Sequence, residues 1–237
     1  LWAGLGGGGA IFLLGAIALI VLRQKRAREE AAINSQAVAE QQESLARNKT
    51  RITEASLRFQ QTASTRALAD SYLQTTHDLL EVLQGAVYLV TPAEAPTGLQ
   101  LLAGFGCSPD IPLTLKFGEG LLGQCAVEQK ARVVTGIQPD YWTITSVLCT
   151  TVPTEIVLLP LLRQAQLLGV VELAPSRPFD AGTQIILDEL TMLLSLNLEI
   201  HLRNEKTRQL LDETRWQTRE MQEQSAEIER QRGTLAA

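Results

Sequence analysis

The stretch that decides the fold spans residues 116–179 and includes FGEGLLGQ at 117–124 and IVLLPLLRQAQLLGVVELA at 156–174. The second string holds two short apolar runs, which are separated by the turn-sized polar gap at residues 163–166. Short runs rich in Val, Ile and Leu on either side of such a gap predict two strands joined in a hairpin. The chain is therefore expected to contain a sheet that closes with this hairpin.

The positions of helix-breaking residues divide the chain into three parts. All nine prolines lie between Pro92 and Pro178, and no glycine occurs at residues 16–84 or 183–232. Asp180 follows the hairpin and is a suitable N-cap for a helix that meets no breaker before Gly233. A content of 45% hydrophobic and 20% charged residues is typical of one globular domain with extensions. The predicted order is helix, compact domain, helix.

The N-terminal segment has the composition of a membrane span. Residues 1–22 carry no charged side chain, and as a helix they would extend ~33 Å, about the thickness of a bilayer core. The next basic residues are Arg23, Lys25, Arg26 and Arg28, and none precedes them. Basic residues on one flank place that flank in the cytoplasm. We therefore expect a single transmembrane helix in contact with membrane lipid, with the compact domain in the cytoplasm. Because the chain begins at Leu1, we also expect a fragment.

Seven-residue spacings occur in both terminal helices. In the first helix the repeating positions are Val38, Leu45, Ile52, Phe59, Arg66, Leu73 and Leu80, and no Pro or Gly interrupts them. In the second helix they are Thr207, Thr214, Met221, Ile228 and Leu235. A sustained seven-residue period is the pattern of a coiled coil. We therefore expect a homodimer through both helices, with a continuous first helix and a polar second seam.

The part between the two helices is expected to form an antiparallel sheet. We predict an entry helix ending near Gln84, strands at 86–90, 99–105 and 131–135, and a short helix at 121–129. A connection of about twenty residues follows the last of these strands, and such long loops in a compact domain are usually functional. The predicted fold class is α+β, an antiparallel sheet with flanking helices, preceded by a transmembrane helix and a coiled coil and followed by a long helix.

Composition excludes several functional classes. A formal net charge of -5 argues against a nucleic-acid-binding protein, which needs a basic face. The three cysteines, Cys107, Cys125 and Cys149, have neither zinc-site spacing nor the pairing of a disulfide framework. The two histidines fall on the flanking helices, so no nucleophile of the domain has a base nearby. We expect no metal or other cofactor and assign no catalytic residue.

The glycines at the start of the deciding stretch need a separate interpretation. Gly118, Gly120 and Gly123 have the spacing of the dinucleotide-binding fingerprint. The helix that follows is too short for the crossover of a parallel strand pair, which that fingerprint requires. We interpret the glycines instead as a tight entry into the short helix.

The order of a Gly-rich entry, a short helix, a meander and an apolar hairpin ending in LGVVEL at 168–173 resembles a GAF domain. GAF domains are small-molecule sensing modules of signalling proteins, and their ligand cavity lies on one face of the sheet. No cysteine here has the adjacent histidine of bilin-binding members, and the Asn-Lys-Phe-Asp-Glu signature of cyclic-nucleotide-binding members is missing. The resemblance therefore implies a GAF-like sensor domain at 67–203 without naming its ligand.

The segment EMQEQSAEIERQR at 220–232 resembles the signalling helices that link GAF domains to histidine-kinase transmitters. The chain is therefore expected to be the sensory region of a bacterial sensor histidine kinase of the inner membrane. Its parts would be a transmembrane helix (1–22), a coiled-coil helix (23–66), the sensor domain (67–203) and an output helix (204–237). Its partners would be a kinase transmitter and a response regulator. Two alternatives stay open: a ligand-free dimeric spacer, or the input region of a cyclic-dinucleotide synthase or a phosphatase.

The candidate ligand-binding residues are mainly apolar and aromatic. They are Phe117, Leu121, Tyr141, Trp142, Leu148, Leu159 and Val171, with Ser146 and Glu172 as polar anchors. Large aromatic residues in a loop must cover something, which favours Tyr141 and Trp142. Each residue also has an ordinary interpretation: core packing for the aliphatic side chains, loop packing for the aromatic ones, and a water-facing position on an alternating strand for Glu172.

Overall fold

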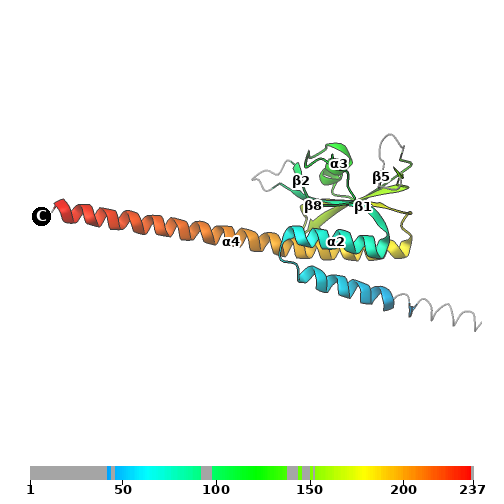
Figure 1. Cartoon of the computed structure of the whole chain (residues 1–237), viewed down its shortest axis with the longest axis horizontal. Coiled ribbons are helices and arrows are strands. Elements are labelled where there is room, and N and C mark those ends of the chain that lie inside the picture. The colour runs from blue at the N-terminus through cyan, green and yellow to red at the C-terminus, as the bar shows by residue number, and fades with distance from the viewer. Residues whose placement is uncertain are drawn as a thin grey trace, which may run out of the picture. The chain divides into compact units, whose positions relative to one another are not determined.

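The computed structural model describes residues 42–43, 46–91, 98–137, 144–145, 150–151 and 153–235 (Figure 1). The chain divides after Arg51 into two units, and the sheet and its helices belong to the second, which begins at Ile52. The predicted transmembrane segment at 1–22 lies outside the described residues, as do residues 23–41 of the predicted coiled coil. Among the residues that the structure describes, no helix has the length and apolar character needed to cross a bilayer.

The described elements are helices and groups of consecutive strands. A helix over residues 46–60 comes first. It is followed by α2 (Thr65–Leu80), β1 (Val82–Val90), β2 (Gly98–Phe105), β3 (Thr114–Lys116), α3 (Gly120–Glu128), β4 (Arg132–Thr135), β5 (Ile144–Thr145), β6 (Thr150–Thr151), β7 (Glu155–Arg163), β8 (Gln166–Pro175) and α4 (Ala181–Leu235).

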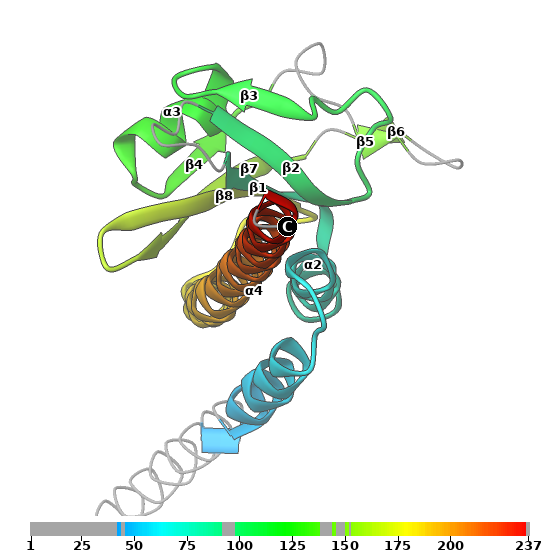
Figure 2. The ribbon, with the colours of Figure 1, turned by 90° about the vertical axis from the view of Figure 1, so that its left-hand side faces the viewer.

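Six of the strands form one antiparallel sheet in the order β3-β2-β1-β8-β7-β4, and β5 pairs with β6 separately. Figure 2 shows α2 and α4 on one face of the large sheet and α3 on the other. The predicted α+β class, an antiparallel sheet with flanking helices, is therefore confirmed for the described part of the chain. The two faces differ in what covers them, and this difference positions the candidate site.

The hairpin and the long helix match the sequence prediction. Gln164 and Ala165 join β7 to β8 with φ angles of 48° and 64°. A two-residue turn with positive φ follows the right-handed twist of the strands that it connects. The Oδ1 atom of Asp180 accepts a hydrogen bond from the backbone N–H of Thr183 at 2.7 Å, as expected of an N-cap. The helix that starts there, α4, has 55 residues.

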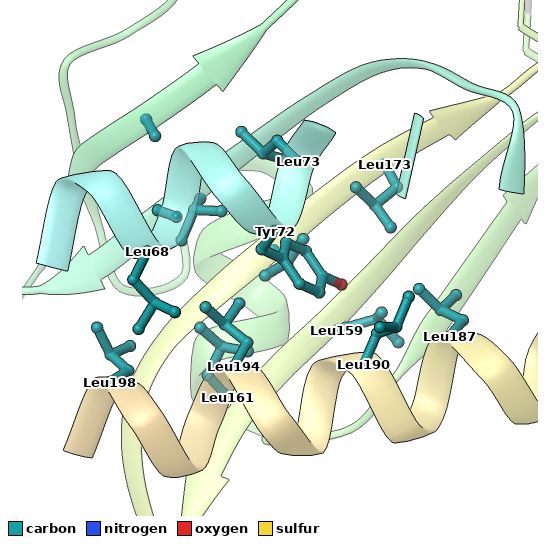
Figure 3. Close-up of a cluster of buried hydrophobic side chains, with 14 of the residues drawn as sticks. Leu68, Tyr72, Leu73, Leu159, Leu161, Leu173, Leu187, Leu190, Leu194 and Leu198 are labelled. Carbon is teal, nitrogen blue, oxygen red and sulfur yellow. The ribbon is translucent and has the colours of Figure 1, made fainter. Parts of the chain in front are cut away.

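The main hydrophobic core lies between the sheet and the pair α2 and α4 (Figure 3). The buried leucines of α4 recur at intervals of three or four residues, at Leu187, Leu190, Leu194 and Leu198. That spacing places them on one face of the helix. They meet Leu68 and Tyr72 of α2 and the inward side chains of β7 and β8. The hydroxyl groups of Tyr72 and Thr191 are 3.0 Å apart and connect the two helices inside this core.

The first helix is not continuous, contrary to the sequence prediction. Helical structure stops after residue 60 and resumes at Thr65, where the Ser64 hydroxyl caps α2 by accepting from the backbone N–H of Ala67 at 3.2 Å. A serine cap supplies a start signal without any Pro or Gly. Phe59, whose ring centroid lies 6.3 Å from that of Tyr72, is buried in the main core.

The seven-residue period over this region has a different cause from the one predicted. Phe59, Leu73 and Leu80 are buried in the core of their own chain, and Arg66 of the same series is exposed. At these positions the seven-residue period therefore results from packing inside one chain. The end of the entry helix also needs correction: α2 ends at Leu80, because Glu81 takes a left-handed conformation with φ 56° and begins the turn into β1.

The three glycines of the fingerprint form the predicted entry into α3. Gly118 and Gly120 have φ angles of 83° and 62°, which only glycine adopts at little cost. A Cβ atom on Gly123 would lie 2.4 Å from the carbonyl oxygen of Lys116, so the start of α3 packs directly on the preceding backbone. The strands before and after α3 lie at opposite edges of the sheet, which excludes the parallel crossover unit of a dinucleotide-binding fold.

Candidate functional site

Two adjoining hollows lie on the face of the sheet that carries α3. The first has a volume of about 230 Å³ and is lined by Gln84, Gly85, Ala86, Cys107, Ser108, Asp110, Ile111, Pro112, Glu172 and Ala174. The second has a volume of about 260 Å³ and is lined by Tyr88, Ile111, Pro112, Leu115, Glu119, Gly120, Leu121, Leu122 and Glu172. Because three residues border both, we treat the hollows as one site and call it the α3-face cavity.

The floor of the α3-face cavity comes from the two central strands. Ala86 of β1 is paired with Glu172 of β8, so their side chains leave the sheet on the same face. Ala174 follows two residues after Glu172 and therefore points the same way. Two alanines beside a glutamate leave space above the sheet that larger side chains would fill. The hollow thus follows from the choice of residues on one face of two paired strands.

One wall of the cavity is the segment between β2 and β3, which is fastened over β1 by hydrogen bonds. The Tyr88 hydroxyl donates to the carbonyl oxygen of Pro112 at 2.8 Å. The Cys107 thiol lies 3.2 Å from the carbonyl oxygen of Gly85, toward which it donates. Within the segment, the N–H of Ile111 donates to the carbonyl oxygen of Ser108 at 3.1 Å. These bonds hold the wall in place while leaving the cavity beneath it open.

Glu172 is the unusual group of the site. Its side chain is 6% exposed, and in the part of the chain that the structure describes it has no hydrogen bond and no ion pair. Burial raises its pKa from 4.5 to about 7. Buried carboxylates are normally paired, because the charged form is costly without a partner. The carboxyl group instead borders both hollows.

The neighbouring titratable groups are held in their neutral forms. Burial raises the pKa of the Tyr88 hydroxyl, and the negative charge of Glu172 raises it further. Burial also raises the pKa of the Cys107 thiol. On the same face, burial raises the pKa of the Cys125 thiol to about 11. Neither thiol is therefore a thiolate at neutral pH, and neither is an activated nucleophile.

The structure brings two of the predicted site residues to the cavity. Leu121 and Glu172 line it, whereas Phe117 packs against the hydrophobic cluster on the same face. Leu159 and Val171 are paired with each other across β7 and β8 and lie on the opposite face, in the main core. They must be removed from the candidate site. The other four predicted residues, Tyr141, Trp142, Ser146 and Leu148, lie outside the residues whose side chains are described.

The sequence analysis missed most of the cavity. The missed residues include Ala86 and Ala174 on the floor and the wall from Cys107 to Pro112. Ala174 could have been found from its two-residue spacing with Glu172, and Ala86 from the pairing of β1 with β8 once that was known. Across the described ranges, no group of three His, Cys, Asp or Glu side chains has the arrangement of a metal site.

Comparisons with known proteins identify the fold. No family model and no curated protein matches the sequence. The GAF domain of the Acinetobacter phosphoenolpyruvate-protein phosphotransferase is 15% identical with a TM-score of 0.55, and 67% of this chain and 97% of that chain are covered. The corresponding GAF domain from Coxiella burnetii is 16% identical with a TM-score of 0.55, covering 68% and 96%. Free methionine-R-sulfoxide reductase from Neisseria meningitidis, in complex with its substrate, is 17% identical with a TM-score of 0.52, covering 66% and 91%. The antiparallel sheet with α3 on one face and α2 and α4 on the other thus has the GAF-domain fold.

Proposed function

We propose that the GAF domain of this chain binds a small molecule in the α3-face cavity and passes the binding event to α4. In the fuller form of the proposal, the chain is the sensory and signal-transmitting region of a bacterial membrane-bound sensor histidine kinase. The binding function is proposed mainly because of Glu172. Its carboxyl group is buried, borders a cavity and has no partner among the described residues.

A buried carboxyl group without a partner among the described residues lowers the stability of the ligand-free protein when it is ionised. The rise in pKa from 4.5 to about 7 corresponds to roughly 3 kcal/mol, since one pKa unit is about 1.4 kcal/mol. An apolar or amide side chain at residue 172 would avoid this cost. Strain or an unsatisfied charge of this kind is typical of binding sites, where a ligand supplies the missing partner.

The fold offers a short route from the cavity to α4. Successive side chains of β8 leave the sheet on opposite faces, so Glu172 faces the cavity while Val171 and Leu173 face the main core. That core also contains the buried leucines of α4. At the end of the hairpin, Arg163 Nε lies 3.0 Å from Glu199 Oε2, which joins β7 to α4 directly. A shift of β8 on ligand binding would therefore reach α4 without an intermediary.

The proposed output is a pair of α4 helices in a dimer. Leu196, Ile200, Leu210 and Met221 are exposed along α4. Ile200 lies seven residues before Thr207 and extends the seam predicted from sequence. The Thr207 and Thr214 hydroxyls donate to carbonyl oxygens four residues earlier, at 2.9 and 2.8 Å, so a seam would not leave them without partners. The kinase assignment itself rests on the resemblance of residues 220–232 to signalling helices.

Among the structures with this fold, the Neisseria reductase was determined in complex with its substrate, which supports a small-molecule site in such a domain. The test is a thermal unfolding screen of the full chain against a library of small metabolites. The control variant is Ser108→Trp, which places a large side chain at the rim of the cavity where Ser108 is exposed. We expect compounds that raise the Tm of the wild type and do not raise that of the variant. Compounds that act equally on both proteins, or none at all, would favour the ligand-free spacer.

A further inference from the structure

We propose that the α3-face cavity selects a small organic cation, a protonated primary amine on a short apolar body, and that Glu172 binds the ammonium group. This inference rests on the proposed function and specifies the chemical class of the ligand. Three features of the described residues carry it: the supply of hydrogen-bond donors and acceptors, the charges at the cavity, and the apolar lining.

Two of the donors beside Glu172, the Tyr88 hydroxyl and the Cys107 thiol, are already engaged. The Tyr88 hydroxyl donates to the Pro112 carbonyl oxygen, and the Cys107 thiol points its proton at the Gly85 carbonyl oxygen. The Glu172 carboxyl group, by contrast, has no partner among the described residues. A ligand that pairs with Glu172 in its carboxylate form must donate hydrogen bonds. An ammonium group has three donors and no acceptor.

The charges at the cavity have one sign. The charged residues in the two linings that the structure gives are Asp110, Glu119 and Glu172, and neither lining includes Lys, Arg or His. One oxygen of Glu119 already accepts from the backbone N–H of Lys116 at 2.8 Å, and Asp110 is exposed. Glu172 is buried, and the attraction within an ion pair is stronger where water is excluded. A bound cation should therefore interact more strongly with Glu172 than with the other two carboxyl groups. An anionic ligand would be repelled by all three.

Apart from the carboxyl groups, Gln84, Ser108 and Tyr88, the side chains around the cavity are apolar, and they set the body of the ligand. Ala86, Ala174, Ile111 and Pro112 surround the first hollow, and Leu115, Leu121 and Leu122 lie around the second. Glu172 stands where the hollows meet. A single charged group at this junction with apolar space on both sides suits a molecule with one ammonium group and a branched or aromatic hydrocarbon body. Volumes of about 230 and 260 Å³ limit that body to a small one.

Binding of the amine should depend on pH in a defined direction. Glu172 must be ionised, and its raised pKa of about 7 means that the carboxylate fraction increases between pH 6 and pH 8. A primary amine stays protonated over this range, with a pKa of about 10. The other titratable groups facing Glu172 are Tyr88, Cys107, Asp110 and Glu119, and burial keeps the first two neutral through this interval. Affinity should therefore rise as pH increases from 6 to 8.

The experiment is a calorimetric titration of the full chain at pH 8 with matched probes. Phenethylamine and 3-methylbutylamine are compared with 2-phenylethanol and 3-methylbutan-1-ol, which lack the charge, and with 3-phenylpropionate and 4-methylpentanoate, which reverse it. The protein variants are Glu172→Gln and the control Asp70→Asn, which removes an exposed carboxyl group from α2 on the other face of the sheet. The thermal unfolding of each variant shows that it is folded.

We expect both amines to bind the wild type at least ~10-fold more tightly than the alcohols, because a charge-assisted hydrogen bond is roughly twice as strong as a neutral one. Glu172→Gln should weaken amine binding by a similar factor and Asp70→Asn should leave it unchanged. Equal affinities for amines and alcohols, or full binding by Glu172→Gln, would overturn the cation proposal while leaving a small-molecule site. No binding of either amine would also overturn it, and the metabolite screen with Ser108→Trp then decides separately whether the cavity binds anything.

Discussion

The carboxyl group of Glu172 links the stability of this domain to pH. Its pKa is raised by burial in the folded chain, from an ordinary value of 4.5 to about 7. Well below pH 4.5 the group is protonated in both states, so its ionisation does not contribute to the pH dependence of stability. As pH rises from 4.5 to 7, the unfolded chain releases this proton while the folded chain retains it, so the free energy of unfolding falls. The domain should therefore lose stability over this interval because of one residue.

Replacing Glu172 with glutamine tests this linkage. Glutamine cannot ionise, so the variant should lack this decrease and be more stable than the wild type at pH 8 by up to roughly 3 kcal/mol. At pH 4.5 the two proteins should be nearly equal. The measurement is urea unfolding of both proteins at several pH values between 4.5 and 8. A variant that is less stable than the wild type at pH 8 would show that the carboxylate has a stabilising partner.

The site residues show which parts of a binding site can be read from a single sequence. Glu172 was chosen from the sequence as a polar anchor, with a water-facing position on an alternating strand as its ordinary interpretation. Leu159 and Val171 were chosen with it, although neighbours on one strand point to opposite faces. The pairing of Leu158 with Glu172 decides that Leu158, and not Leu159, belongs to the cavity face. Pairing register is a long-range property, and the string of apolar residues in β7 carries no local sign of it.

At the scale of elements, the helix over residues 46–60 contributes to the core of the sensor domain. Phe59 is fully buried and Leu57, two residues before it, is 54% exposed. Removing a buried phenylalanine ring leaves a cavity and typically costs ~3 to 5 kcal/mol. We expect Phe59→Ala to destabilise the domain by about that amount and Leu57→Ala to change its stability by less than ~0.5 kcal/mol.

Chemical denaturation of the two variants, monitored by the unfolding of the sheet, compares the two sites directly. Phe59 and Leu57 lie in the same helix but differ in burial. A loss of stability caused by altered helix propensity would therefore appear in both variants. Equal effects of the two substitutions would mean that this helix does not pack on α2 in solution. A large effect of Phe59→Ala alone would also establish that a fragment starting at residue 67 lacks part of its core.

The elements themselves were largely predictable, because strands, caps and turns are local signals. The hairpin of β7 and β8, the short helix α3 and the cap at Asp180 all follow from residues within a few positions of one another. The break before α2 was missed although Ser64 begins it, since a serine inside a polar segment is an ambiguous signal. At Phe59, Leu73 and Leu80 the seven-residue period belongs to the core of one chain, because a one-sided core stripe and a coiled-coil seam share nearly the same spacing.

At the scale of the whole molecule, the proposed signal leaves through α4. One inserted residue turns the following part of a helix by ~100°, whereas seven restore the seam to within ~20°. In the proposed full-length kinase, insertions of one to seven residues after Asp212 should make autophosphorylation depart from wild type and return near seven. A steady decline with insertion length, and no recovery at seven, would mean that α4 acts as a tether.

The most specific proposal is that a small organic cation binds over Glu172 on the α3 face of the sheet. The most direct test is a nuclear magnetic resonance titration of the isotope-labelled full chain with phenethylamine, following the backbone amide signals. We expect the largest shifts at Gly85, Ala86, Ser108 and Glu172, which line the first hollow, and their loss in Glu172→Gln. Unchanged signals at these four residues under saturating amine, or shifts that persist in the variant, would contradict it.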